Sequence, residues 1–514
     1  MNAVTINVPV QNAAPVAKPA GPSKQALAGL LGIFIAAMMA GLNNRVGALG
    51  LADVRGVMGA SLDDASWLSS AYTVGELIAM PFASWFAITL SVRRFHISMV
   101  TICGVIAAIL PFIHDLNLLI ALRFVQGVSS GALIPILMMA ALKFLPPNIR
   151  LHGLALYAMT ATFAPNLAIW LSGQWADVLS DWRWIYWQVI PLCIIAGSLT
   201  AWGLPKEGVK YARFKEGNWL GLVCGVSSLT LIAIALDQGV RLDWFNSSLI
   251  SVCFFGGLIL FGCYVLTEWH HKAPFMRPQL LGRRNLGIGS VLLTMLLVVL
   301  MSGSMLPSTH LASLHSYRAL QLAPVGLLIA LPQLVLGSVV ALLLYKKWVD
   351  ARIVMSIGLF LIALACFSGA QITPLWHRDQ FITAQLLQAF GQPMAVVSIL
   401  FLMTSVLDPS EGPFFSGTIN TLRVFGSLIG GAVVGQLLTV RSHFHNEMLL
   451  DRASMVGNSL ANTIPNEQLG GVIAQQSLVM SVGDAYLVLG VLALVLIPLA
   501  LCMNFVPAPN LNKS

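Results

Sequence analysis

Four charged side chains within apolar stretches are the residues of this sequence that could do chemistry inside a membrane. Among the 20 acidic residues, only Glu76 lies well inside an apolar stretch, and Arg45, Arg123 and Arg423 lie inside three others. A charge at the centre of a bilayer costs about 2.5–3.5 kcal/mol, so such groups usually face a cavity and a partner. A carboxylate that alternates between an isolated site and one beside a guanidinium changes its affinity for protons, as proton coupling requires.

We therefore predict that Glu76 carries a proton, that Arg123 modulates it and that Arg45 helps to bind a substrate. A rise of about 1.5 Å per residue places Glu76, Arg45 and Asn43 within about 5 Å of one another in depth. Simpler interpretations remain open. Glu76 could form a static ion pair, Arg123 could pack helices together, and Arg45 and Arg423 could extend towards a surface.

The composition excludes a water-soluble protein. Of the 514 residues, 57% are hydrophobic and 9% are charged, whereas about 25% of the residues in an ordinary soluble domain are charged. The formal net charge of +8 could indicate a nucleic-acid binder, but the basic residues lie in short segments between apolar runs. This placement favours a membrane protein whose basic loops set its orientation, and no nucleic-acid partner is expected.

Membrane-spanning helices must position these charges. A bilayer core about 30 Å thick requires about 20 apolar residues of helix, and windows of that length predict fourteen spans. Their ranges are 26–50, 67–90, 97–113, 117–142, 153–175, 185–203, 218–236, 247–267, 287–306, 322–345, 353–370, 381–406, 415–440 and 480–504. Both termini lie on the side that holds most of the Lys and Arg residues, so they are predicted to face the cytoplasm.

A faint internal repeat predicts two six-helix bundles. A shift of the sequence that places Arg123 on Gln385 also places Gln126 on Gln388, although chance could produce so short a match. The predicted organisation is a disordered cytoplasmic tail, an N-terminal bundle, a linker with two inserted helices, a C-terminal bundle and a second cytoplasmic tail. These parts cover residues 1–25, 26–204, 205–286, 287–506 and 507–514. The outer segment 441–479 is predicted to be a loop with one short amphipathic helix around 468–476.

Several stretches resemble the major facilitator superfamily, specifically its fourteen-span drug:proton antiporters of the EmrB/QacA type. They are Arg123-Phe-Val-Gln126-Gly127-Val-Ser-Ser-Gly131, Leu145-Pro146-Pro147, Ala164-Pro165, Asp181-Trp182-Arg183-Trp184-Ile185, Leu236-Asp237-Gln238-Gly239, Asp243-Trp244-Phe245 and Gln475-Gln476-Ser477. The resemblance implies an all-α polytopic major facilitator fold of two six-helix bundles plus two inserted helices. It also implies proton-coupled export by alternating access in the bacterial inner membrane, with a periplasmic adaptor protein and an outer-membrane channel as partners.

The sequence departs from this family at three places. In the loop after span 2, Ser84, Ala87-Ile88 and Ser91 replace the family's Gly, Ala-Asp, Gly pattern. Where span 1 of the family carries Leu-Asp followed by Thr, this chain has Leu42-Asn43-Asn44-Arg45. The Gly-Pro and Gly-Gly signature of antiporters in span 5 is replaced by Ala168-Ile169 and Ser172-Gly173. An uptake carrier therefore remains an alternative to an exporter, and a membrane sensor that transports nothing is the alternative from another class.

The substrate is predicted to bind among the polar and helix-breaking residues of spans 1, 4, 5, 12 and 13. These residues are Asn43, Asn44, Arg45, Gln126, Pro165, Gln385, Gln388 and Arg423. Three buried arginines against one buried carboxylate leave a positive site, which favours amphipathic organic anions or neutral molecules over lipophilic cations.

No enzyme, cofactor or metal site is expected. The sequence contains neither a Walker phosphate loop, nor a dinucleotide fingerprint, nor a Gly-x-Ser-x-Gly elbow, nor a His-Glu-x-x-His pair. All seven cysteines lie in apolar stretches, which argues against a disulfide framework. His310, His315, His443 and His445 are interpreted as solvated residues near span ends.

Overall fold

A computed structural model describes residues 24–145, 147–456 and 466–509, and every regular element in these ranges is helical. Within them, 14 helical segments are long and apolar enough to cross a membrane, which confirms the predicted all-α fold with fourteen spans. The helices are α1 (Lys24–Leu49), α2 (Leu51–Met58), α3 (Leu62–Leu90), α4 (Val92–Ile109), α5 (Leu116–Gly131), α6 (Leu133–Phe144), α7 (Pro147–Gly173), α8 (Trp184–Trp187), α9 (Val189–Gly203), α10 (Ala212–Glu216), α11 (Trp219–Gln238), α12 (Ser248–His270), α13 (Arg284–His315), α14 (Ala319–Leu344), α15 (Ala351–Gly369), α16 (Ile382–Thr404), α17 (Gly412–Val456) and α19 (Asn466–Leu501).

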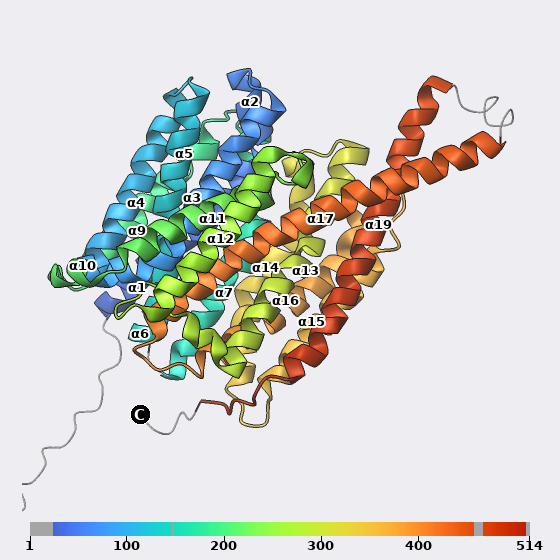
Figure 1. The fold of residues 1–514 in the computed structure, drawn as a ribbon. Coiled ribbons are helices and arrows are strands. Elements are labelled where there is room, and N and C mark those ends of the chain that lie inside the picture. Colours follow the sequence, from blue (N-terminus) through green and yellow to red (C-terminus); the bar gives the residue numbers. More distant parts are fainter. Residues whose placement is uncertain (1–23, 146, 457–465, 510–514) are drawn as a thin grey trace, which may run out of the picture.

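Two groups of helices face each other along two seams (Figure 1). The helices up to α9 form one bundle and those from α13 to α19 the other, and α3 packs on α17 while α7 packs on α14. The inserted helices α11 and α12 pack on each other, and α11 contacts both α3 and α17. We call the face where α1 begins the N-terminal face and the other the opposite face. The domain boundaries stay predictions, and most residues of both predicted tails lie outside the described residues.

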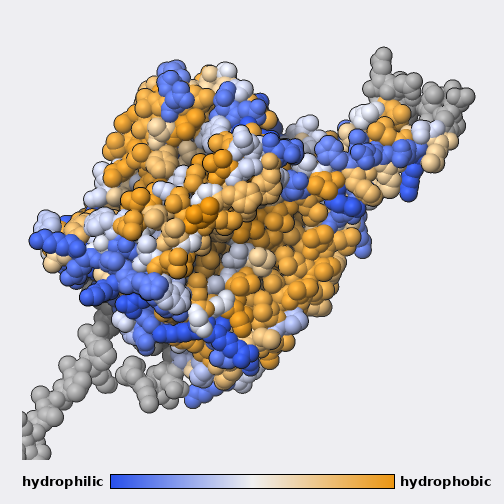
Figure 2. All heavy atoms as spheres, viewed as in Figure 1, coloured by the Kyte–Doolittle hydropathy of each residue, from blue (hydrophilic) through white to orange (hydrophobic). Residues whose placement is uncertain are grey.

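The side of the molecule is apolar, as a lipid-facing surface must be. Figure 2 shows a broad orange area of apolar side chains on the flank of the bundle, with blue polar side chains towards the two faces. On α12, Val252, Phe255, Ile259 and Leu266 are each more than half exposed. The chain is a multi-pass membrane protein.

The segment 441–479, predicted to be mostly loop, is helical in its described part, and the short helix predicted around 468–476 belongs to α19. α17 continues as helix through residue 456, and α19 already begins at Asn466, so the two helices project beyond the bundle (Figure 1). Asp484 of α19 forms ion pairs of 2.5 Å with Arg441 and 2.7 Å with His445, one helical turn apart on α17. These contacts stabilise α17 beyond residue 440, where the apolar window ends and hydropathy no longer predicts a helix.

Glycines bring α3 and α5 into backbone contact. A Cβ atom at Gly127 would clash with the carbonyl oxygen of Tyr72, and one at Gly131 would clash with the backbone of Glu76. Small residues allow membrane helices to approach this closely. The same contacts fix Tyr72 and Glu76 of α3 beside the polar residues of α5.

Candidate functional site

Glu76 lies at the midpoint of α3 and is buried, with 4% of its surface exposed. Asn44 of α1 donates a hydrogen bond from Nδ2 to Oε2 of Glu76. Arg423 of α17 and Arg45 of α1 both interact electrostatically with the carboxylate. A buried carboxylate thus has an amide donor and two cations around it, and one of these cations belongs to the other bundle.

Arg423 joins three helices at the seam between the bundles. Its Nη1 donates to Oγ1 of Thr160 on α7, and its guanidinium lies 5.7 Å from the ring centre of Tyr157. The Tyr157 hydroxyl in turn donates to Oδ1 of Asn420 at 2.9 Å. With 8% of its surface exposed, Arg423 lies inside the protein and does not extend to a surface.

Arg123 lies apart from Glu76, on the far side of Tyr72. Its guanidinium is 4.3 Å from the ring centre of Tyr72, and its Nη1 donates to Oε1 of Gln126 at 2.7 Å. The Tyr72 hydroxyl donates to Oγ of Ser130 at 2.6 Å and accepts a bond from Nδ2 of Asn43 at 3.2 Å. Tyr72 therefore stands between the carboxylate and this arginine.

The predicted glutamines of α16 are buried in the C-terminal bundle. Gln385 donates to the carbonyl oxygen of Gly303 at 3.0 Å, and Gln388 donates to Oγ of Ser302 at 2.9 Å. Both bonds reach α13. The structure thus places Gln385 and Gln388 on a different polar network from Asn43, Asn44, Arg45 and Gln126.

A bridge between the bundles passes through α7 and α14. Thr162 of α7 donates to Oε1 of Gln333 on α14 at 3.3 Å, and Gln333 donates to the carbonyl oxygen of Ala389 at 3.2 Å. Pro165 lies half-buried beside Asn166, whose carbonyl oxygen abuts Gly326 of α14. Pro165 is therefore at the seam, next to the polar residues of both bundles.

Four buried amide atoms of this region have no hydrogen-bond partner among the described residues. They are Oδ1 of Asn43, Nε2 of Gln126, Oδ1 of Asn166 and Oε1 of Gln385. A buried polar atom without a partner costs about 1–3 kcal/mol. Each one marks a place where water or a ligand would form a bond, and three of the four belong to residues predicted to bind substrate.

The two bundles also contact each other on both sides of Glu76. At the N-terminal face, Gly417 of α17 lies against the backbone of Pro81, and Oγ of Ser416 donates to the carbonyl oxygen of Pro135 at 2.5 Å. At the opposite face, Arg318 at the start of α14 forms an ion pair of 2.6 Å with Asp177. The polar site therefore lies between one set of contacts towards the N-terminal face and a second set at the opposite face.

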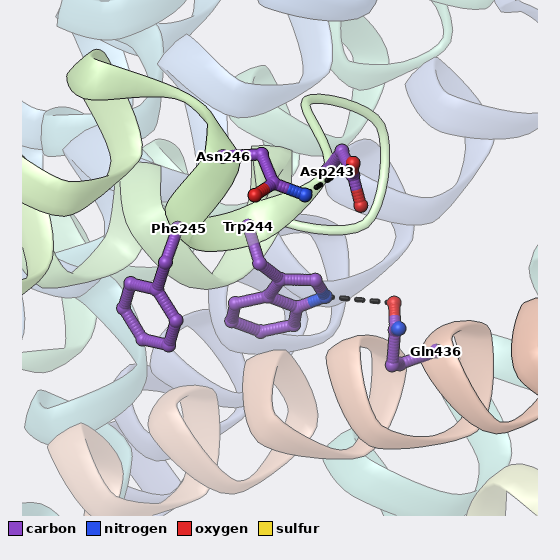
Figure 3. A pocket seen from close by; sticks show the side chains of 5 residues that line it. All are labelled: Asp243, Trp244, Phe245, Asn246 and Gln436. Carbon is purple, nitrogen blue, oxygen red and sulfur yellow. Dashed lines mark hydrogen bonds between the residues drawn. The ribbon is translucent and has the colours of Figure 1, made fainter.

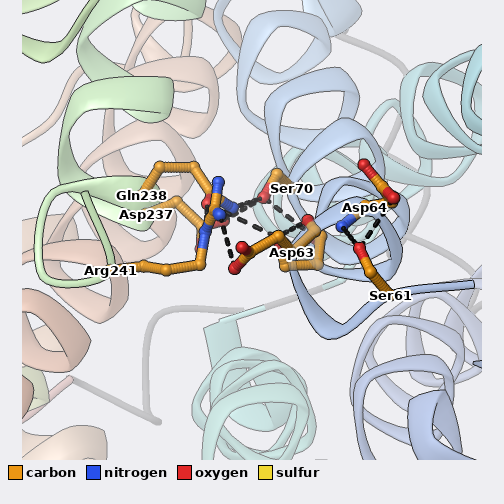
Figure 4. Close-up of polar contacts among 8 residues, drawn as sticks. Ser61, Asp63, Asp64, Ser70, Asp237, Gln238 and Arg241 are labelled. Carbon is orange, nitrogen blue, oxygen red and sulfur yellow. Dashed lines mark hydrogen bonds and ion pairs between the residues drawn. The ribbon is translucent and has the colours of Figure 1, made fainter.

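The turn after α11 is bound to the start of α3, at the opposite face of the molecule (Figure 4). Arg241 forms an ion pair of 2.8 Å with Asp63 and donates from Nε to Oε1 of Gln238 at 2.5 Å. Ser70 of α3 donates to Asp237 and accepts from Gln238. Three polar residues of α11 and its turn are thus tied to the start of α3.

The inserted hairpin, which consists of α11, α12 and the turn between them, contacts α17 through fewer groups. Nε1 of Trp244 donates to Oε1 of Gln436 at 2.8 Å, at a shallow pocket also lined by Asp243, Phe245 and Asn246 (Figure 3). Nearby, Val240 lies against Gly435. The inserted helices thereby connect α3 of one bundle to α17 of the other at the opposite face.

Sequence reasoning missed several polar residues of the site. Tyr72 precedes Glu76 by one helical turn, and Asn420 precedes Arg423 by about one turn, so helical spacing could have found both. Gln333 and Thr162 belong to different bundles, and nothing in the sequence pairs them.

Burial distinguishes several polar residues near the span ends. Glu268, near the end of α12, is fully buried and accepts hydrogen bonds from Phe275 N at 2.7 Å and Asn218 Nδ2 at 3.0 Å. His310 and His445 are also buried, so they are not solvated residues. Packing by neighbouring helices at the span ends covers these groups, which a count along one helix cannot detect.

Comparisons with known proteins agree with this architecture. The sequence model of the Major Facilitator Superfamily matches residues 30–332. The chain is 26% identical to the probable multidrug resistance protein EmrY of Escherichia coli (strain K12), over 89% of this chain and 91% of that protein. It is 23% identical to the fatty acid resistance protein FarB of Neisseria gonorrhoeae, over 91% and 94% of the two chains.

Solved structures show the same fold at low identity. The human organic anion transporter MFSD10 aligns with a TM-score of 0.54 and 12% identity, over 92% of this chain and all of that one. A peptide transporter, POT, aligns with a TM-score of 0.56 and 14% identity, over 92% and 94% of the two chains. The resemblance to EmrB-type transporters is confirmed by the curated relatives. Because the family model covers more than half of the sequence and the helices have the matching arrangement, the chain belongs to the Major Facilitator Superfamily.

Proposed function

We propose that this chain is a proton-coupled exporter of amphipathic small molecules, including drugs and organic anions, in the bacterial inner membrane. One observation carries the proposal: the carboxylate of Glu76 is buried at the midpoint of α3 and hydrogen-bonded to Asn44, with Arg45 of one bundle and Arg423 of the other near it. In alternating access the bundles rock about such a central site. Movement of α17 away from α3 would take Arg423 away from Glu76 and so change the affinity of the carboxylate for protons.

In this proposal each predicted residue has a role. Glu76 binds and releases the proton, with Asn44 as its hydrogen-bond donor. Arg123 acts on Glu76 through the intervening ring of Tyr72. The substrate would bond the unpartnered amide atoms of Asn43 and Gln126 in the N-terminal bundle, and that of Gln385 in the C-terminal bundle.

Names of relatives support the substrate class. EmrY and EmrB are named for multidrug resistance or export, and FarB for resistance to fatty acids, which are amphipathic anions. The distribution of Lys and Arg supports an N-terminal face in the cytoplasm. A periplasmic adaptor protein and an outer-membrane channel are proposed partners by resemblance to EmrB-type systems.

Transport into inverted membrane vesicles tests the proposal. With an acidic interior, wild-type vesicles are expected to accumulate radiolabelled decanoate or the neutral amphipathic drug chloramphenicol, and Glu76→Gln is expected to abolish this accumulation. The exposed Glu207, changed to Gln, is the matched control and should accumulate substrate as the wild type does. Exchange of labelled for unlabelled substrate without a pH gradient should persist in Glu76→Gln, which shows that the variant is folded.

The outcome also separates the alternatives. Accumulation driven by the pH gradient in right-side-out vesicles would indicate an uptake carrier, and transport in neither orientation would favour a sensor. Full transport by Glu76→Gln would overturn the assigned proton carrier. Deletion of an adaptor gene that abolishes drug resistance in cells but leaves transport in vesicles intact would support the proposed partner.

A further inference from the structure

Arg123 is a buried cation that meets no carboxylate in the described part of the chain. It has 2% of its surface exposed, and its guanidinium forms a single hydrogen bond, to Gln126, and no ion pair among the described residues. Burial of a charge costs several kcal/mol unless an opposite charge and hydrogen bonds compensate it. An anion would supply both.

Gln126 adds a second donor at the same place. Its Oε1 accepts the bond from Arg123, so the geminal Nε2 is next to the guanidinium, and Nε2 is buried without a partner. The side chain is fully buried. A guanidinium fork and an amide N–H offer donors only, which is the requirement of a carboxylate.

Aromatic rings hold the guanidinium in position. The ring centres of Tyr72 and Tyr186 lie 4.3 Å and 5.6 Å from its central carbon. A side chain at Gly47 of α1 would clash with its Nη2. Residues of α1, α3 and α8 therefore surround the α5 arginine.

The remaining surroundings are apolar. Tyr186 belongs to a buried cluster that includes Leu42, Val46, Leu68 and Ile185. In such surroundings a charged hydrogen bond is stronger than in water. An anion with an apolar body suits this environment, whereas a small hydrated ion does not.

We propose that Arg123 and Gln126, between Tyr72 and Tyr186, form a subsite for the carboxylate of an amphipathic organic acid. This inference rests on the proposed transport function and names a substrate class for it. The subsite lies one helical turn from Glu76 along α3, towards the opposite face, because Tyr72 precedes Glu76 by one turn. Substrate anion and proton thus bind at neighbouring but separate groups.

Binding to the full-length protein in detergent tests the subsite. The probes are decanoate and the neutral decanamide, which has the same chain length, with affinities measured by isothermal titration calorimetry in a chloride-free buffer. Decanoate is expected to bind the wild type at least tenfold more tightly than decanamide. Arg123→Gln should weaken decanoate binding at least tenfold and leave decanamide binding unchanged, and Gln126→Leu should weaken decanoate binding about threefold to tenfold.

Controls separate the subsite from charge in general and from misfolding. Arg183→Gln removes an exposed arginine of the same bundle and should bind decanoate like the wild type. Arg123→Lys keeps the charge but not the planar fork, so its affinity should lie between those of the wild type and Arg123→Gln. If Arg123→Gln does not fold, Gln126→Leu and Arg123→Lys still decide the question.

Unchanged decanoate affinity in Arg123→Gln, or in both Gln126→Leu and Arg123→Lys, would overturn the proposal. Arg123-dependent binding of chloride with none of decanoate would overturn the assignment to an organic acid. Export of the neutral drug chloramphenicol driven by a pH gradient is measured separately. Export that persists without decanoate binding would reject the subsite alone. Absence of this export in the wild type would reject the proposed function alone.

Discussion

Arg318 at the start of α14 forms a 2.6 Å ion pair with Asp177, which follows α7, and this pair joins the bundles at the opposite face. Asp177 also accepts a bond at 3.0 Å from the backbone N–H of Leu320. Opening of this face must separate α7 from α14 here. The pair therefore contributes to the stability of the closed face.

Arg318→Gln is expected to favour the open face by a small factor. The Arg318 side chain is 62% exposed, and exposed pairs contribute about 0.2–1 kcal/mol, so the equilibrium should shift by no more than about fivefold. Asn166, buried beside α14, is changed to Cys in a variant without native cysteines. This cysteine should react faster with a thiol reagent added from the opposite face when Arg318→Gln is also present. The swapped pair Asp177→Arg with Arg318→Asp should restore the slow rate, and equal rates in all variants would argue against a closing role.

A disulfide between the inserted hairpin and α17 should stop transport. A Cβ atom at Gly435 would lie 3.9 Å from that of Val240, within the range of about 3.5–4.5 Å found in disulfides. Val240→Cys with Gly435→Cys should therefore form a bond on mild oxidation. Because the hairpin is held to α3 by an ion pair, this bond would tie α3 to α17.

Transport of chloramphenicol into inverted vesicles should fall at least tenfold after oxidation of that variant and return on reduction. Each single cysteine variant is the control and should be insensitive to oxidant. Undiminished transport with the disulfide fully formed would mean that the hairpin and α17 move together.

The intramembrane charges were predictable because a charged residue within about 20 apolar ones is visible in any window of that length. The proximity of Glu76 and Arg423 was not, because it depends on which helices of different bundles meet. Hydropathy also could not extend α17 past Arg441, since the ion pairs with Asp484 that support it come from another helix. Local periodicity finds helices and their charges, whereas contacts between distant segments require the packed structure.

Gly127→Ala should destabilise the protein. The added methyl group would meet the backbone of Tyr72, which cannot move without displacing α3. Overpacking of this kind costs about 1–3 kcal/mol, and the melting temperature in detergent should fall. Gly262→Ala on α12 is the matched control, because nothing lies within 4 Å of its Cβ position. A variant as stable as the wild type would show that α3 and α5 can separate freely.

The ion pair of Glu411 should make stability depend on pH. Burial acts to raise the pKa of Glu411, but two hydrogen bonds from Arg283, of 2.7 Å and 2.6 Å, hold this pKa below its usual range. The stabilisation is therefore present above the unfolded pKa of about 4.3 and is lost as pH falls through the folded pKa.

Glu411→Gln should accordingly lower the melting temperature at pH 7, and the difference from the wild type should shrink below about pH 4.3. The Arg283 side chain is 41% exposed, so solvent limits the effect to about 1 kcal/mol or less. Glu207→Gln, at an exposed position, should show no such pH dependence. A difference that grows on acidification would contradict this account.

Arg423→Gln should impair both stability and coupling. It removes the cation that α17 places near Glu76 and leaves that buried carboxylate with fewer charged partners. It also removes the charged hydrogen bond to Thr160, and a hydrogen bond of this kind contributes about 1.5–3 kcal/mol. Accumulation of substrate driven by a pH gradient should fall at least tenfold, while substrate exchange without a gradient should fall much less, because exchange needs no proton transfer. Arg378→Gln, at an exposed position, should change neither. Equal losses of accumulation and exchange would mean that Arg423 serves the fold and has no part in coupling.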